Sequence, residues 1–152
     1  MAMDRDDVIS TLNDLIETAR DGEEGFRTSA ESAKSSDLRA FFQEGAHRCA
    51  GAVSRLQQAV RSLGGDPAER GTVAGAMHRG WVNLKSALSM DDDKAILNEV
   101  ERGEDHACEV YRDALQKDLP SDVRMMVQHM YDGARQNHDR VKLLRDQYAA
   151  RT

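Results

Sequence analysis

The chain has 152 residues, of which 39% are hydrophobic and 32% charged, and its formal net charge is −6. This length suits a single domain spanning residues 1–152, and the scarcity of aromatic residues and proline favours an all-α bundle over a β-sandwich. The negative charge disfavours nucleic acid as a partner, because phosphate binding needs a concentrated basic surface. No apolar run approaches the roughly 20 residues of a membrane span, and the N-terminus lacks a signal-peptide core. We therefore expect a cytoplasmic protein with no membrane partner.

Hydrophobic residues recur every three or four positions, which predicts amphipathic helices along almost the whole chain. The first two are expected at residues 4–33 and 36–63, joined by a short Ser-Ser-Asp turn that supplies an N-cap. A shorter amphipathic segment follows at residues 71–88. Three aspartates then precede a third long helix that ends at about residue 115, and a Pro-Ser-Asp turn begins the fourth at about residue 121.

The two closely joined helix pairs are separated by a long connection, residues 64–90. This spacing predicts that the connection climbs back along the bundle, so that the third long helix runs parallel to the second. The result is a four-helix bundle with a helical crossover, the topology of ferritin-like folds. An up-down-up-down bundle with a decorated loop is the alternative. Trp81 is expected to anchor the connection over the bundle.

Three acidic residues and a histidine fall on helix faces that should be apolar. Glu23 lies on the apolar stripe of the first helix, Glu101 and Glu104 on that of the third, and His138 on that of the fourth. Counting residues from the turns brings all four to one height of a crossover bundle. Buried carboxylates need a counter-charge, a proton or a metal, and carboxylates with a neutral imidazole suit iron, manganese or zinc. These four residues are therefore the predicted metal ligands.

The alternative to a metal is a buried polar cluster neutralised by Arg27 or Arg135. Glycines inside the helices bear on the same region, because each lowers helix stability by roughly 0.5–1 kcal/mol relative to alanine. They indicate a waist of close approach or a cavity, although tight packing without a ligand explains them equally. Five glycines lie at about this height: Gly22, Gly25, Gly45, Gly103 and Gly133.

The other histidines are expected to lie at the surface. Glu44 and His47 have the spacing of a Glu-x-x-His metal motif, but they fall opposite the apolar face of their helix and should face solvent. His106 and His129 are also expected to point outward, and His78 lies on the connection. None of these histidines is a predicted ligand.

Cys49 and Cys108 face inward on neighbouring helices and are expected to act as small hydrophobic residues. They form neither a disulfide framework nor a CxxC motif. No serine or cysteine has an inward-facing base at helical spacing, so nucleophilic catalysis is not predicted and no catalytic residue is assigned.

Several segments resemble a bacterial family of ferritin-like four-helix-bundle proteins that is catalogued as a domain of unknown function, distantly related to rubrerythrin. These segments are LNDLIET at residues 12–18, GTVAGAMHRGW at 71–81, ERGED at 101–105 and HDRV at 138–141. The resemblance covers essentially the whole chain and implies the ferritin-like fold. It implies no established activity, so it supplies no catalytic residue.

The chain departs from the di-iron pattern of ferritins and rubrerythrin-like proteins. Carboxylates of the first and third helices and His138 can be matched to that pattern. The second helix, however, offers Gly45 and Cys49 where a Glu-x-x-His pair would be needed, and Arg135 stands where the fourth helix would need a glutamate. A complete two-metal centre is therefore not expected.

These observations predict a ferritin-like binding or stress-associated protein, rather than an enzyme, with a vestigial or single-metal site at mid-bundle. One alternative is an iron- or manganese-dependent oxidoreductase, or an iron-handling protein, that uses the same four ligands. Another is a helical interaction module that forms a homodimer. Metal content distinguishes the first two, and the mass of the native oligomer tests the third.

Overall fold

The computed structural model describes residues 3–68, 81, 83–90 and 92–150. Over these residues it contains helices and no strand, so the expected all-α class is confirmed. None of the described helices carries an apolar stretch that could cross a membrane. The helices are α1 (Arg5–Ser32), α2 (Ser36–Ser62), α4 (Leu84–Ser89), α5 (Asp93–Leu115) and α6 (Ser121–Ala150).

The long helices begin and end within about a residue of the predicted positions, because local side chains satisfy their terminal backbone groups. Asp4, Ser35 and Asp92 each accept a hydrogen bond from a backbone N–H in the first turn of α1, α2 and α5, respectively. After α2, Gly64 adopts a positive φ of 81°, which ends the helix in a conformation that favours glycine. These short-range signals fix the helix boundaries.

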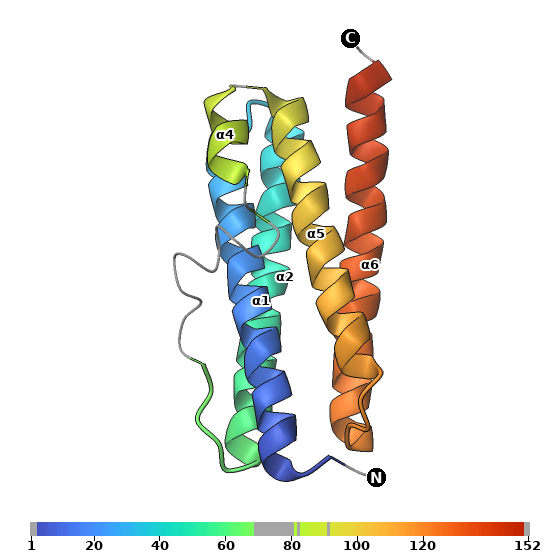
Figure 1. Cartoon of the computed structure of the whole chain (residues 1–152). Helices are drawn as coiled ribbons and strands as arrows, with labels where there is room; N and C mark the ends of the chain where they lie inside the picture. Colours follow the sequence, from blue (N-terminus) through green and yellow to red (C-terminus); the bar gives the residue numbers. More distant parts are fainter. Residues whose placement is uncertain (1–2, 69–80, 82, 91, 151–152) are drawn as a thin grey trace.

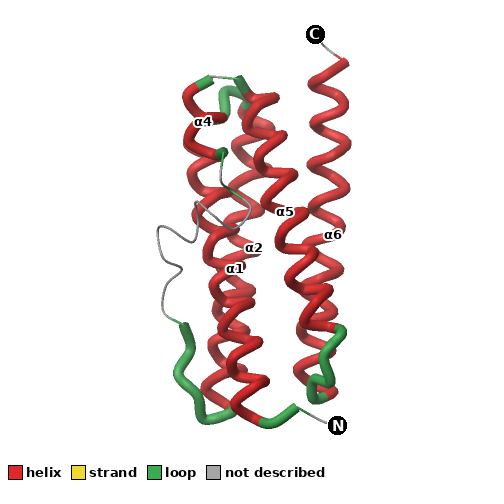
Figure 2. The backbone as a smooth tube through the Cα atoms, viewed as in Figure 1, coloured by secondary structure: helices red, strands yellow, loops and turns green. Residues whose placement is uncertain are grey.

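The four long helices lie side by side as two antiparallel pairs, α1 with α2 and α5 with α6 (Figure 1). The pairs are held together mainly by α1 against α5, whereas α2 and α6 touch at few points. Helix α2 ends at one end of the molecule and α4 lies at the other, so α5 begins where α2 begins and runs in the same direction (Figures 1 and 2).

The connection between α2 and α5 is described only in part. Trp81 is 3% exposed, which confirms that it is buried against the bundle. Helix α4 follows and packs on α5, with smaller contact to α1. The remainder of the predicted amphipathic segment, residues 69–80 and 82, lies outside the described residues, as does Asp91 before α5.

The core divides into two apolar clusters along the long axis. The cluster nearer α4 is aromatic: Phe26 meets Trp81 edge to face at a centroid distance of 5.5 Å and lies 6.4 Å from Phe42. The other cluster is mainly aliphatic, and Leu12 and Leu56 are fully buried in it. The faces that periodicity identifies as apolar are the faces that are buried.

Trp81 sits between two glycines on different helices. An ideal Cβ atom at Gly25 of α1 would lie 2.5 Å from a carbon of the indole, and one at Gly103 of α5 would lie 2.3 Å from another. Real Cβ atoms do not approach other atoms this closely. The indole therefore occupies space that only these two glycines leave open.

The other predicted waist glycines fall into two groups. A Cβ atom at Gly22 would meet the sulfur of Cys49 at 2.9 Å, and one at Gly45 would meet the ring of Phe26 at 2.6 Å. Close packing against side chains thus accounts for both, as it does for the glycines around the tryptophan. Gly133 is different, because a Cβ atom there would meet nothing within 4 Å.

Asp93 ties the second helix pair to the turn of the first. Its two carboxylate oxygens accept hydrogen bonds from the backbone N–H groups of Lys34 (2.8 Å) and Ser35 (3.0 Å), 59 and 58 residues away in the sequence. One side chain at the start of α5 therefore satisfies the backbone of the α1–α2 turn.

Replacing Asp93 with alanine is expected to lower the free energy of unfolding by about 1–3 kcal/mol, because two backbone donors lose a charged acceptor. Asp93→Asn keeps one acceptor oxygen and should lose less. Urea denaturation followed by circular dichroism measures both. Asp113→Ala, an exposed change near the other end of α5, is the control and should stay within about 0.5 kcal/mol of the parent. Equal decreases in the free energy of unfolding for Asp93→Ala and Asp113→Ala would contradict a stabilising role for the hydrogen bonds of Asp93.

Candidate metal centre

Glu23 lies at the outer face of the α1–α2 pair. Its Oε2 accepts a hydrogen bond from Arg27 at 3.0 Å, one turn along α1, and 22% of its side chain is exposed. It borders an open groove of about 330 Å³ that His47 of α2 also lines. Glu23 is thus neutralised at the surface by Arg27, one of the two arginines named in the alternative to a metal site.

Glu104 lies inside the bundle and is paired with an arginine. Its side chain is 3% exposed, and its Oε1 accepts a hydrogen bond of 2.9 Å from Arg48 of α2. Burial raises the pKa of the Glu104 carboxyl, and the guanidinium acts in the opposite direction. Burial lowers the pKa of Arg48, but Glu104, Cys49 and Tyr111 together raise it above its usual value. The interior acid is therefore held by a fixed cation.

The second oxygen of Glu104 is less well satisfied. Asn137 of α6 is near enough to lower the pKa of this carboxyl, yet its Nδ2 and the Oε2 atom do not reach ordinary hydrogen-bond geometry with any described group. An enclosed cavity of about 20 Å³ adjoins the carboxylate, and a buried water needs about 10–15 Å³. This space can hold one water molecule beside the Glu104–Arg48 pair.

The thiols around this ion pair are buried. Burial raises the pKa of Cys49 to about 12 and that of Cys108 to about 11. Burial also raises the pKa of Tyr111, which lines the same cavity. Thiolates are the nucleophilic and metal-binding form of cysteine, so both cysteines behave at neutral pH as the small hydrophobic residues predicted from the sequence.

A cluster of metal-binding side chains lies between α5 and α6. One ligand atom from each of Glu101, Asp105 and His138 lies within 4.8 Å of the other two, and among the described residues this is the only such cluster. Nε2 of His138 is 2.6 Å from Oδ1 of Asp105 and 4.0 Å from Oε1 of Glu101. The two acids are four residues apart on α5, so they occupy one face of that helix.

Neighbouring side chains orient this cluster. Nδ1 of His138 lies 3.2 Å from Oδ1 of Asp139, and Nε2, 2.6 Å from Oδ1 of Asp105, donates a hydrogen bond to that carboxylate. A metal bound at Nε2 would replace this proton, and Asp139 would then hold the remaining proton on Nδ1. Oε2 of Glu101 accepts a hydrogen bond from Arg145, so its Oε1 remains on the histidine side. Exposed fractions rise outward, from 12% at Glu101 through 20% at His138 to 60% at Asp105.

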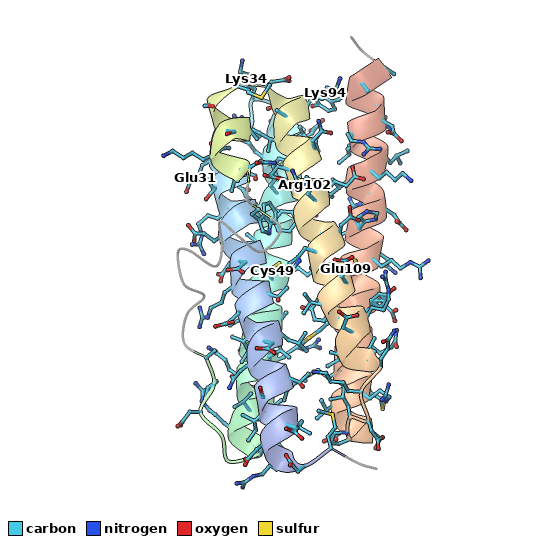
Figure 3. All side chains as sticks on the ribbon, in the orientation of Figure 1. Glu31, Lys34, Cys49, Lys94, Arg102 and Glu109 are labelled. Atoms are coloured by element: carbon cyan, nitrogen blue, oxygen red, sulfur yellow. The ribbon has the colours of Figure 1, made fainter. Side chains whose placement is uncertain are left out.

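An open groove of about 750 Å³ reaches the cluster from solvent. It runs between α5 and α6, and Asp105 and His138 form part of its wall. Arg102 and Glu109, which are labelled on α5 in Figure 3, belong to its lining as well. A small ion or molecule can therefore reach the cluster without any opening of the bundle.

Comparison with known protein families supplies a family but no activity. Residues 7–117 match a family described as a domain of unknown function (DUF2383). The chain belongs to this family. The DUF2383 match contains most of α1 together with α2, α4 and α5, and it ends before α6, so His138 lies outside it. No curated protein matches the chain.

The structure of this DUF2383 chain does not bring the four predicted ligands together at one centre. Glu101 and His138 do meet, but Glu104 faces Arg48 in the interior and Glu23 faces Arg27 at the surface. Residues three apart on a helix differ by about 60° in direction. That angle is enough to direct Glu101 toward α6 and Glu104 toward α2.

Arg27 and Arg135 were expected to neutralise a buried acidic cluster, but the arginine that pairs with the buried Glu104 is Arg48. Arg135 is exposed, and Arg27 serves acids of its own helix. Arg48 and Asp105 are the residues that sequence reasoning missed. The first lies beside the outward-facing His47, and the second is exposed, so a search for buried polar positions passes over both.

The histidine predictions have mixed outcomes. Glu44, His47 and His129 are exposed, which confirms that the Glu-x-x-His spacing does not form an inward pair. His106 is half-buried and lines both the small cavity near the ion pair and the open groove between α5 and α6, so it faces solvent only in part. His78 lies outside the described residues.

Glu99 is a further buried acid that the sequence did not reveal. It is 2% exposed, and its carboxylate forms no hydrogen bond with side chains of the described residues, its nearest charge being Arg102 at 3.7 Å. Burial raises its pKa, whereas Arg102 and the backbone of Asn83 lower it. It lies one turn before Gly103, on the side of α5 that faces the tryptophan and α4 rather than the cluster.

Proposed function

We propose that this protein is a ferritin-like metal-binding protein that holds one divalent ion between α5 and α6, with Glu101, Asp105 and His138 as ligands. It keeps the predicted ferritin-like four-helix bundle but moves the metal away from the bundle centre. The observation that carries the proposal is the approach of three ligand atoms from two helices to within 4.8 Å.

The ferritin-like topology is supported by the direction of the helices. Helices α2 and α5 run the same way, and α2 ends at the end of the molecule opposite to the one where α5 begins (Figure 1). Ferritin-like bundles have one such long crossover, and they build metal centres from facing helices. The contacts of α1 with α5 and of α2 with α6 suit that arrangement.

The chemistry of the cluster suits a borderline to hard divalent ion. Two carboxylates and one neutral imidazole favour iron(II), manganese(II) or zinc(II). The contact of His138 with Asp139 provides the outer partner that a metal-binding histidine usually has. Ligand bonds of about 2.0–2.2 Å require more than the 2.6 Å now separating His138 and Asp105, and the exposed Asp105 can rotate outward to provide it.

The interior ion pair explains why the bundle centre is not the metal site in this proposal. Arg48 pairs with Glu104 inside the bundle, where no histidine or second acid of the described residues joins it in a ligand cluster. Arg145 also pairs with Glu101, but it contacts Oε2 and leaves Oε1 on the side of His138. A cation beside Glu104 would have to displace the guanidinium of the partly buried Arg48. The two sites can be separated experimentally, because they share no residue.

Titration of tag-free protein with manganese(II), iron(II) under anaerobic conditions, or zinc(II) is expected to give about one ion per chain. His138→Gln removes the only nitrogen ligand and should weaken binding at least tenfold, a loss typical of disturbed ligand shells. Metal content after desalting and isothermal titration calorimetry measure the two quantities.

The matched controls are His129→Gln, an exposed histidine on the same helix, and Glu104→Gln in the interior. Neither should change metal stoichiometry or affinity. Loss of metal in Glu104→Gln, with binding retained in His138→Gln, would return the metal to the bundle centre and refute the α5–α6 site. Absence of binding to the parent protein would leave Asp105 and His138 as a simple ion pair.

A second candidate function is a metal-dependent oxidoreductase. The open groove of about 750 Å³ favours it, because a substrate in that groove would meet Asp105 and His138 directly. The metal-loaded protein should then consume oxygen or peroxide in the presence of a reductant, and His138→Gln should abolish this consumption. Stoichiometric binding without turnover supports the binding protein.

A further inference from the structure

A third groove, between α2 and α6, contains two glycines that packing does not explain. An ideal Cβ atom at Gly51 of α2 or Gly133 of α6 would meet nothing within 4 Å. Both are helix-interior positions, where alanine would be more favourable by roughly 0.5–1 kcal/mol. The glycines around Trp81 and Phe26 are required by neighbouring rings, whereas these two leave open space on facing helices.

The space is large enough for a small organic molecule. The groove has a volume of about 460 Å³, within the range of about 300–1,000 Å³ typical of small-molecule sites. The half-buried Ala52 lines the groove, and the nearly buried side chains of Tyr111 and Met130 lie at its floor. It shares no residue with the cluster between α5 and α6.

The charge of this groove opposes that of the protein. Its described lining residues include Arg48, Arg55, His47 and His129 and no acid, although the whole chain carries a net charge of −6. Arg55 is exposed and forms no hydrogen bond or ion pair within the described part of the chain. An unpaired arginine beside an apolar surface can bind a carboxylate in a bidentate manner.

We propose that the α2–α6 groove binds an organic anion that has a carboxylate or sulfonate head and an apolar body. The head lies against Arg55, with His47 and His129 at the rim, and the body lies along Ala52 and the open space at Gly133, above the floor of the groove. Arg48 contributes positive charge from the groove wall while it remains bonded to Glu104. The site is independent of the proposed metal centre.

The probe is 2-naphthoate, and its neutral analogue 2-naphthamide is the control ligand. Fluorescence titration or calorimetry is expected to show saturable binding of one naphthoate per chain, with naphthamide roughly tenfold weaker or more because it lacks the charge-assisted contact. Arg55→Gln should weaken naphthoate by a similar factor and leave naphthamide unchanged. Arg61→Gln, an exposed arginine on the same helix outside the groove, should change neither.

Filling the groove provides a second, steric test. Gly133→Leu places a side chain in the open space and should abolish binding of both ligands, whereas Gly51→Ala leaves most of the volume and should preserve it. Melting temperatures at or above that of the parent verify that both variants fold. Equal affinity for the two ligands, an unchanged affinity in Arg55→Gln, or no binding at all would overturn the proposal. Tighter binding of hexaglutamate than of naphthoate would assign the groove to an acidic protein partner and overturn it too.

Discussion

Arg48→Met is expected to lower the free energy of unfolding by about 3 kcal/mol at pH 7, because it leaves the buried Glu104 carboxylate without its cation. Methionine keeps most of the aliphatic volume, so the loss reflects charge more than packing. Glu104→Gln should have a smaller effect or raise stability, since the half-buried Arg48 can still reach water. The double variant Arg48→Met/Glu104→Gln should recover most of the loss. Denaturant unfolding of the four proteins forms a double-mutant cycle.

The pH dependence of this cycle provides a sharper test. Burial holds the pKa of Glu104 above its value in the unfolded chain. The folded protein therefore binds this proton more tightly than the unfolded chain does, and the resulting contribution to the free energy of unfolding is lost as the pH rises through the raised pKa. Removing Arg48 raises that pKa further. The deficit of Arg48→Met should therefore be smallest in acid, where the carboxyl is protonated in both proteins, and should grow as the pH rises. A deficit independent of pH would instead indicate lost packing of the guanidinium on Phe26, 5.8 Å away.

Trp81→Ala is expected to lower the free energy of unfolding by about 3–5 kcal/mol, the usual loss for a large buried aromatic side chain. Gly103→Ala should lose at least about 1–3 kcal/mol through overpacking, because its Cβ atom would lie 2.3 Å from the indole. Thermal and denaturant melts measure both changes.

Gly133→Ala is the matched control for Gly103→Ala. Its Cβ atom meets nothing within 4 Å, so this change should raise the free energy of unfolding by roughly 0.5–1 kcal/mol through helix propensity alone. Glycine-to-alanine substitution should thus lower the free energy of unfolding at position 103 and raise it at position 133. A loss at both positions, or a gain at both, would contradict the packing assigned to the tryptophan.

The sequence predicted the helices well because their determinants are local. Asp4, Ser35 and Gly64 lie within a turn of the helix ends that they define, and the three- and four-residue periodicity identifies the buried face without knowledge of its partner. The all-α class and the burial of Trp81 follow from the same information. The contact of Asp93 with the α1–α2 turn could not be predicted in this way, because it joins segments more than 50 residues apart in the sequence.

The candidate site was less predictable because helix periodicity gives the direction of a Cβ atom but not the reach of a side chain. Arg48 starts on the flank of α2, and its long side chain still extends inward to Glu104. Asp105 is exposed and becomes a candidate ligand only because α6 brings His138 to 2.6 Å. Glu23 lies at the edge of its apolar stripe, where Arg27 on the same helix can neutralise it.

The contact of one indole with two glycines has a consequence for how related sequences can differ. Gly25 and Gly103 lie on separate helices and do not need each other; both are required by Trp81. A residue smaller than tryptophan at position 81 would remove the need for glycine at positions 25 and 103. A residue larger than glycine at position 25 or 103 would exclude tryptophan from position 81. Substitutions at these three positions should therefore occur together among homologues, as correlated changes between segments that are remote in the chain.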